Sequence, residues 1–154
     1  MLRMVLRNTI WYRDAIPPGE RKYAAPLKRV VFPVYDMAVI LLGLFGLLVG
    51  FQATDAALPA PGPTVLYTVM LLAGVLCLVG CAFPVLWAVE IAGKTIVLIT
   101  LTALLITMLT AAATIPGHTG LTITPTILAM MMIPALRLWI LGVEIAGRRD
   151  SVTI

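Results

Sequence analysis

The chain of 154 residues is 61% apolar and only 12% charged, and its mean hydropathy is +1.06. Soluble domains carry about 45–50% apolar and about 25% charged residues. So many apolar side chains cannot all be hidden within 16.5 kDa of protein. Intrinsic disorder requires the opposite composition, low hydrophobicity with high charge. The composition therefore excludes a soluble or a disordered protein and predicts an integral membrane protein.

The segment 1–29 precedes the first apolar stretch and is rich in Arg and Lys. We expect it to lie in the cytoplasm or at the membrane interface, where positive side chains attract anionic lipid headgroups. The net charge of +4 is accordingly interpreted as membrane topology, and no nucleic-acid partner is predicted.

Four apolar stretches follow, and each exceeds the roughly 20 residues of helix that cross about 30 Å of hydrocarbon. Backbone groups in lipid must be paired internally, and the stretches lack the alternation of barrel strands, so each is predicted to be a helix. The predicted fold class is all-α, with a four-helix transmembrane bundle over residues 30–147 and a short tail over 148–154. The helices are expected at about 30–51, 65–92, 95–115 and 121–146.

Lys and Arg are distributed asymmetrically around these stretches. They precede the first helix, follow the fourth, and occur between the second and third as Lys94, whereas the connections 52–64 and 116–120 contain none. Because cytoplasmic loops carry the excess of positive charge, we expect a multi-pass protein of the bacterial cytoplasmic membrane with both termini in the cytoplasm.

A short repeat, Val-Glu-Ile-Ala-Gly followed by a basic residue, occurs at residues 89–94 and again at 143–148. Each copy follows a tryptophan, Trp87 or Trp139, which we expect to anchor a helix end at the membrane interface. If both copies end a helix on the cytoplasmic side, with Gly93 and Lys94 ending the second helix, the chain consists of two parallel two-helix units. The alternative is that the two copies arose independently, because both helix ends meet the same requirements at the membrane interface.

Two glutamates, Glu90 and Glu144, each precede a basic residue by four positions, Lys94 and Arg148 respectively. This is the favourable order for an ion pair along one helix, so two interfacial ion pairs are predicted. The alternative is a proton-coupled site or a ring of acids at the mouth of an oligomer.

Arg137 is the one charge clearly inside an apolar stretch. Its long side chain is expected to extend past Trp139 to the interface or to pair with Asp36 near the start of the first helix. A role in binding a substrate is the alternative.

Small residues recur at helical spacing in three of the stretches, and such faces allow helices to approach closely. The predicted helix-packing residues are Gly43, Gly46 and Gly50 in the first helix, Ala73, Cys77 and Cys81 in the second, and Ala103 and Thr107 in the third. In the third helix Ala103 and Thr107 share a side with Thr100, Thr110 and Thr114. This threonine face either packs against other helices or lines a hydrated path once several copies assemble.

No phosphate-binding loop, zinc-binding histidine pair or serine nucleophile motif occurs in the sequence. We therefore predict a protein that is not an enzyme, with no catalytic residue, cofactor or metal.

The Arg-rich start (Arg3, Arg7, Arg13), the Ala, Leu and Val-rich crossings and the short tail Arg148-Arg149-Asp150 resemble the small four-helix membrane proteins of actinobacterial phages, including the holin type of lysis cassettes. The resemblance covers the whole chain in outline. It implies oligomerisation in the cytoplasmic membrane and permeabilisation that releases an endolysin. The tail of this chain is shorter and less charged than that of many holins.

Three functions are compatible with the sequence. The first is holin-like permeabilisation by a homo-oligomer. The second is an accessory or superinfection-exclusion subunit that binds a larger membrane complex. The third is a small secondary transporter, although residues 37–51 contain no ionisable side chain that could serve as the glutamate of four-helix exporters.

Overall fold

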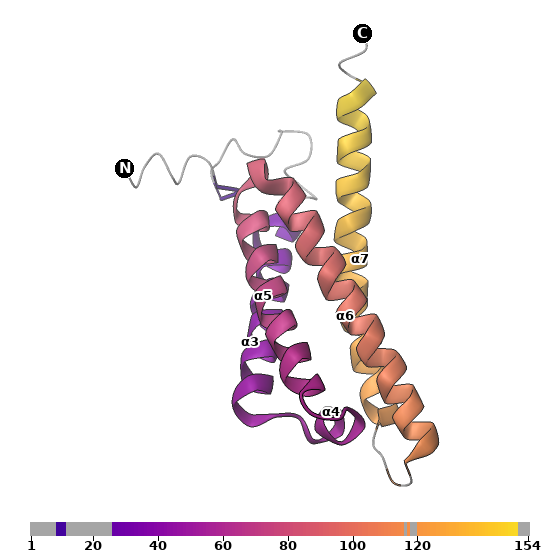
Figure 1. Ribbon diagram of the computed structural model, residues 1–154. Coiled ribbons are helices and arrows are strands. Elements are labelled where there is room, and N and C mark those ends of the chain that lie inside the picture. The colour runs from indigo at the N-terminus through magenta and orange to yellow at the C-terminus, as the bar shows by residue number, and fades with distance from the viewer. Residues whose placement is uncertain (1–8, 12–25, 116, 118–119, 151–154) are drawn as a thin grey trace.

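The protein is a bundle of long helices that run alternately up and down (Figure 1). The computed structural model describes residues 9–11, 26–115, 117 and 120–150, without the side chains of 84, 120 and 144–150. Within these residues all regular structure is helical, which confirms the all-α prediction. In the described part of the chain, four helices are long and apolar enough to cross a membrane, at Leu27–Val49, Gly62–Ala82, Trp87–Thr114 and Leu121–Val143.

The helices follow one another in space as they do along the chain. The elements are the π-helical turn η1 (Leu27–Val31), α3 (Phe32–Val49), the short α4 (Gln52–Ala57), α5 (Gly62–Ala82), the 3-10 turn η2 (Pro84–Leu86), α6 (Trp87–Thr114) and α7 (Gly120–Asp150). The helix α3 packs along α5, α5 along α6 and α6 along α7, whereas α3 and α7 meet only locally. The bundle is therefore an open arc. We call the end where α3 and α6 begin the charged end, and the opposite end the α4 end.

The connection between the second and third long helices lies earlier in the chain than the sequence analysis predicted. The helix α5 ends at Ala82, Phe83 is extended (φ −114°, ψ 99°) and α6 begins at Trp87. The predicted bounds 65–92 and 95–115 are thus wrong, and Gly93 and Lys94 lie inside α6. The physical reason is Pro84, which cannot continue a helix and disfavours helical geometry at the residue before it.

The early turn also changes the meaning of the repeat. The copy at residues 89–94 lies in the first turns of α6, whereas the copy at 143–148 lies in the last turns of α7. The two copies do not both end a helix, so the repeat provides no support for two parallel two-helix units.

Two glycines allow α3 to lie directly against α5. A Cβ atom at Gly43 would be 2.5 Å from the backbone nitrogen of Leu71, and one at Gly46 would enter the ring of Tyr67. Both glycines are buried. Gly50 has a different role from the predicted one, because it ends α3 with φ +75°, a conformation that side chains other than glycine disfavour.

Small residues of α5 are buried in the same way: Ala73 and Cys77 face Gly93 of α6, whereas Cys81 Sγ lies 3.9 Å from the carbonyl oxygen of Lys28 in η1. Ala73, Cys77 and Cys81 are at most 2% exposed, and both cysteines are free thiols. A Cβ atom at Gly80 would be 2.5 Å from the backbone nitrogen of Glu90. Close contact between α5 and α6 therefore brings the first turns of α6 into the bundle, where the side chains of Glu90 and Lys94 are buried.

The described part of the basic N-terminal segment contacts the charged end. The Ile10 backbone N–H donates to the carbonyl oxygen of Ala82 at 3.0 Å. That carbonyl lies at the end of α5, where a helix leaves its last oxygens without intrahelical partners. Trp11 Nε1 donates to the Arg29 carbonyl at 3.2 Å, and Arg29 Nε donates to the Ile10 carbonyl at 3.1 Å.

Candidate functional site

Four charged side chains from three helices meet inside the bundle, and we call them the charge cluster: Asp36 of α3, Glu90 and Lys94 of α6, and Arg137 of α7. Arg137 Nε donates to Glu90 Oε1 at 2.6 Å, and Arg137 Nη2 donates to Glu90 Oε2 at 2.8 Å. Lys94 Nζ donates to Asp36 Oδ1. The side chains of the first pair are at most 5% exposed and those of the second pair are fully buried.

Two aromatic rings of α3 cover the cations of the charge cluster. The centroid of the Phe32 ring lies 4.9 Å from Arg137 Cζ, and that of the Tyr35 ring lies 5.2 Å from Lys94 Nζ. An aromatic face attracts a cation electrostatically, most strongly where water is absent. The helix α3 therefore contributes one carboxylate and two rings to a cluster whose formal charges sum to zero.

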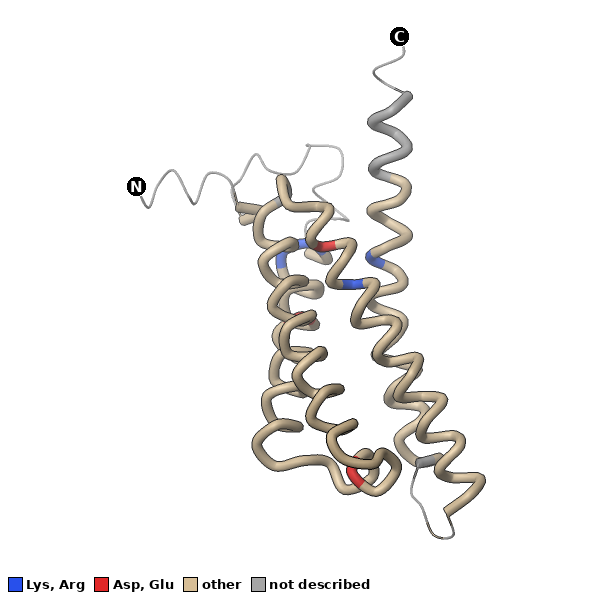
Figure 2. The backbone as a smooth tube through the Cα atoms, viewed as in Figure 1, with Lys and Arg blue, Asp and Glu red and all other residues tan. Residues whose placement is uncertain are grey.

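The early turn at Pro84 determines how deep the charge cluster lies. With α6 beginning at Trp87, Glu90 and Lys94 lie about 4.5 and about 10 Å further along the helix axis, at 1.5 Å per residue. An interfacial ion pair was predicted for Glu90, whereas its side chain is buried within the bundle, 2% exposed. Figure 2 shows acidic and basic residues gathered toward the charged end, separated by uncharged helix from the acidic residue in α4.

The pairing differs from the predicted pairing. Glu90 bonds Arg137 of another helix instead of Lys94 four residues along its own, and Lys94 bonds Asp36. Arg137 is buried instead of extending to the interface, and Glu90 offers it a bidentate partner within the bundle. The i, i+4 spacing did place Glu90 and Lys94 on one face, but that face turns inward, where α3 and α7 supply the opposite charges.

Several predicted residues lie away from the charge cluster. The side chains of Glu144 and Arg148 lie outside the described residues, so the predicted pair between them stays a prediction. Trp87 is 45% exposed and Trp139 is 74% exposed. Ala103 is exposed and Thr107 is half-buried, so neither contributes to close packing inside the chain as Gly43 and Gly46 do.

Tyr35 was not among the predicted site residues. Its hydroxyl group donates a hydrogen bond to the backbone carbonyl of Met130 at 2.8 Å. In a helix that carbonyl would accept from the N–H of residue 134, but Pro134 has none. A backbone oxygen without a donor is costly in the absence of water, and Tyr35 supplies the donor from α3. A proline inside an apolar stretch of the sequence could have indicated this bond, because it leaves the carbonyl four residues earlier without its helical N–H donor.

The charge cluster joins three helices, because each of its two ion pairs connects side chains of different helices. Asp36 Oδ2 is buried and has no hydrogen-bond partner among the described residues. Moving a charge into a bilayer costs about 2.5–3.5 kcal/mol even on insertion scales, so such residues generally serve a function. Within the described part of the chain no three His, Cys, Asp or Glu side chains could together hold a metal ion.

Comparisons with protein-family models, with curated proteins and with solved structures each return no match to this chain. The functional assignment therefore depends on the residues and their geometry.

The first prediction concerns the identity of the ion pairs. Arg137→Gln leaves Glu90 charged and buried, so we expect the free energy of unfolding to fall by about 3–5 kcal/mol. Adding Glu90→Gln should recover most of this loss, whereas adding Asp36→Asn should not, because Asp36 is bonded to Lys94. Denaturant titration in mixed micelles measures the free energy of unfolding. Equal recovery by both second substitutions would contradict the assigned pairs.

The second prediction concerns the hydrogen bond of Tyr35. Tyr35→Phe should lower the free energy of unfolding by about 1 kcal/mol, because the Met130 carbonyl loses its donor. In a Pro134→Ala background, Tyr35→Phe should lower the free energy of unfolding much less, since the N–H of Ala at position 134 can donate to the Met130 carbonyl. The same titration measures both steps of the cycle. A cost of Tyr35→Phe that is unchanged by Pro134→Ala would show that the carbonyl is not the important partner.

Proposed function

We propose that this protein is a non-enzymatic membrane protein that assembles with further copies of itself and permeabilises the bacterial cytoplasmic membrane, as holins do. The observation that supports this function best is the threonine face of α6. Its members, Thr100, Ala103, Thr107, Thr110 and Thr114, are exposed or half-buried in the single chain.

The hydroxyl groups of the threonine face are compatible with both lipid and water. Each of the four threonines donates to the carbonyl four residues earlier in α6, at 2.8–2.9 Å. Because the hydroxyl hydrogen is already bonded, the side chain can face lipid at little cost. The hydroxyl oxygen can still accept a hydrogen bond from water. A face of this kind can lie against lipid in dispersed copies and against water after assembly.

The open arc leaves surfaces for assembly. Because α3 and α7 meet only locally, the four helices do not close around a common axis. The charge cluster meanwhile holds α3, α6 and α7 together as one preformed unit. Exposed small residues allow a helix of another copy to approach closely. By the distribution of Lys and Arg, the charged end faces the cytoplasm in this proposal.

A second function, a small transporter, is favoured by one specific observation, the burial of Asp36, Glu90, Lys94 and Arg137 within the helices. Buried ionisable residues in membrane segments often lie on ion pathways. The two functions differ in a measurable way, because a transporter, like an accessory subunit, leaves the membrane potential largely intact.

The third prediction tests permeabilisation. Induced expression in bacteria, followed with a dye that reports membrane potential, should show an intact potential and then an abrupt collapse. Combining Thr107→Leu with Thr110→Leu should delay or abolish the collapse, because bulky side chains without a hydroxyl replace the threonine face. Thr68→Leu is the matched control, since Thr68 is exposed on α5 and makes the same bond to the carbonyl four residues earlier, at 2.8 Å.

The control should collapse the potential on the normal schedule. A potential that stays intact although the wild-type protein is present in the membrane would refute the proposed function. A collapse at the same time in all three proteins would refute the role of the threonine face.

A further inference from the structure

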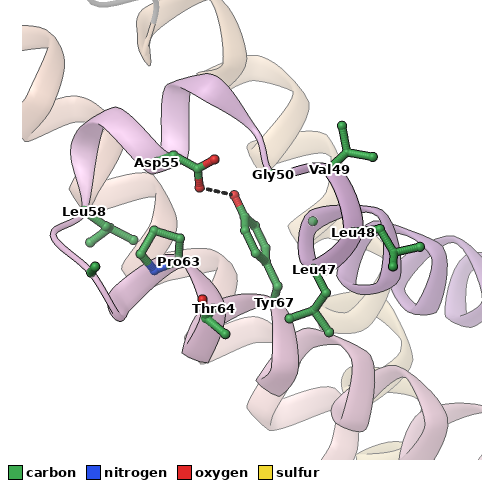
Figure 3. Close-up of a pocket in the computed structure, with 11 residues that line it drawn as sticks. Leu47, Leu48, Val49, Gly50, Asp55, Leu58, Pro63, Thr64 and Tyr67 are labelled. Atoms are coloured by element: carbon green, nitrogen blue, oxygen red, sulfur yellow. Dashed lines mark hydrogen bonds between the residues drawn. The ribbon is translucent and has the colours of Figure 1, made fainter.

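A cleft of about 420 Å³ lies at the α4 end, bounded by the last turn of α3, by α4 and by the first turns of α5 (Figure 3). We call it the α4 cleft. Most of the residues that line it have apolar side chains or none, but polar atoms make up the larger part of its exposed lining. The polar side chains that Figure 3 labels in it are Asp55, Thr64 and Tyr67.

Hydrogen bonds hold the polar groups of the α4 cleft in place. The Tyr67 hydroxyl accepts from the backbone N–H of Phe51 at 3.2 Å and donates to Asp55 Oδ1 at 3.1 Å (Figure 3). The Phe51 and Tyr67 rings meet edge to face with centroids 5.6 Å apart. Tyr67 is only 4% exposed, so its hydroxyl position is fixed by the fold. The orientation of the Asp55 carboxylate follows from that position.

The second oxygen of the carboxylate, Oδ2, lies against Gly50. A Cβ atom at residue 50 would collide with Asp55 Oδ2, so the absence of a side chain at Gly50 gives this oxygen its space. Asp55 is exposed, and among the described residues no hydrogen bond to Oδ2 is present. Tyr67 thus occupies one oxygen and leaves the other open.

The charge of Asp55 has no counterpart near it in the sequence. It is the one charged residue between positions 37 and 89, and no charged residue lies between positions 95 and 136. Leu47, Leu58 and Pro63 also line the cleft and offer apolar contact. A carboxylate in a cleft that has no other charged side chain, and that is bordered by leucine and proline side chains, favours a ligand that combines one positive charge with aliphatic groups.

We propose that the α4 cleft binds an alkylammonium group. The ammonium N–H groups donate to Asp55 Oδ2, and the aliphatic part covers the leucine and proline side chains. A divalent metal ion fits less well, because it requires several oxygen ligands and the cleft presents one carboxylate. The ammonium group can belong to a small soluble amine or to the headgroup of a lipid such as phosphatidylethanolamine. This proposal does not depend on the threonine face or on permeabilisation.

The fourth prediction uses tert-butylammonium as the probe and tert-butanol as its neutral analogue of similar shape. The full-length protein is placed in nanodiscs of phosphatidylglycerol, and the Phe51 amide and Leu58 methyl resonances are followed by NMR. Saturable shifts are expected with tert-butylammonium and not with tert-butanol. Asp55→Asn should weaken binding about tenfold or more, as expected when a charged hydrogen-bond partner is lost.

Asp150→Asn is the matched control, because it removes one negative charge far along the chain from Asp55. It should leave the affinity for tert-butylammonium unchanged. Resonances of Asp55→Asn that are unchanged outside the α4 cleft separate loss of binding from loss of fold. Shifts that do not saturate, equal shifts with tert-butanol, or undiminished binding by Asp55→Asn would each overturn the proposal. Weaker binding in nanodiscs that contain phosphatidylethanolamine would identify the lipid headgroup as a ligand, and equal binding would identify a soluble amine.

Discussion

Four charged side chains lie in the helices of this bundle where water cannot solvate them, and their pairing constrains the rest of the structure. Asp36 with Lys94 joins α3 to α6, and Glu90 with Arg137 joins α6 to α7. Ion pairs of this kind add little net stability, but breaking one leaves a charge without compensation and is strongly destabilising. The charge cluster therefore specifies which helices meet and at what depth. The small residues of α5, where Gly80 faces the backbone of Glu90, allow α6 to come close enough for the pairs to form.

Two prolines determine much of this geometry through the backbone. Pro84 ends α5 early, so the chain turns before Trp87 and carries Glu90 and Lys94 into the bundle. Pro134 interrupts the hydrogen bonding of α7, and the hydroxyl of Tyr35 satisfies the carbonyl that this interruption leaves. Both effects follow from one rule: in the absence of water each polar backbone group must find a partner in the protein.

The number of helices and their apolar character could be predicted from the sequence, because composition and length decide them directly. The buried faces of Gly43, Gly46 and Cys77 also lie where the spacing of small residues indicated. The predicted turn after the second helix lies too late in the chain. The charges of Glu90 and Lys94 indicated a membrane interface there, whereas the helix end is determined by Pro84. The pairing could not be predicted, since an i, i+4 spacing shows that two residues share a face but not what that face meets. Partners distant in the chain, such as Tyr35 and Met130, depend on how helices pack.

The charge cluster and the threonine face divide the proposed function between them: the cluster holds one chain together, while the face is open to other copies. The central claim is that Glu90 bonds Arg137 across helices. Solid-state NMR of the protein in lipid bilayers, with carboxyl-¹³C glutamate and ¹⁵N side-chain labels on arginine and lysine, measures this contact directly. Strong dipolar coupling is expected between the Glu90 carboxyl carbon and the Arg137 guanidinium, and Arg137→Gln should abolish it. Coupling of that carbon to Lys94 Nζ, with none to Arg137, would contradict this claim.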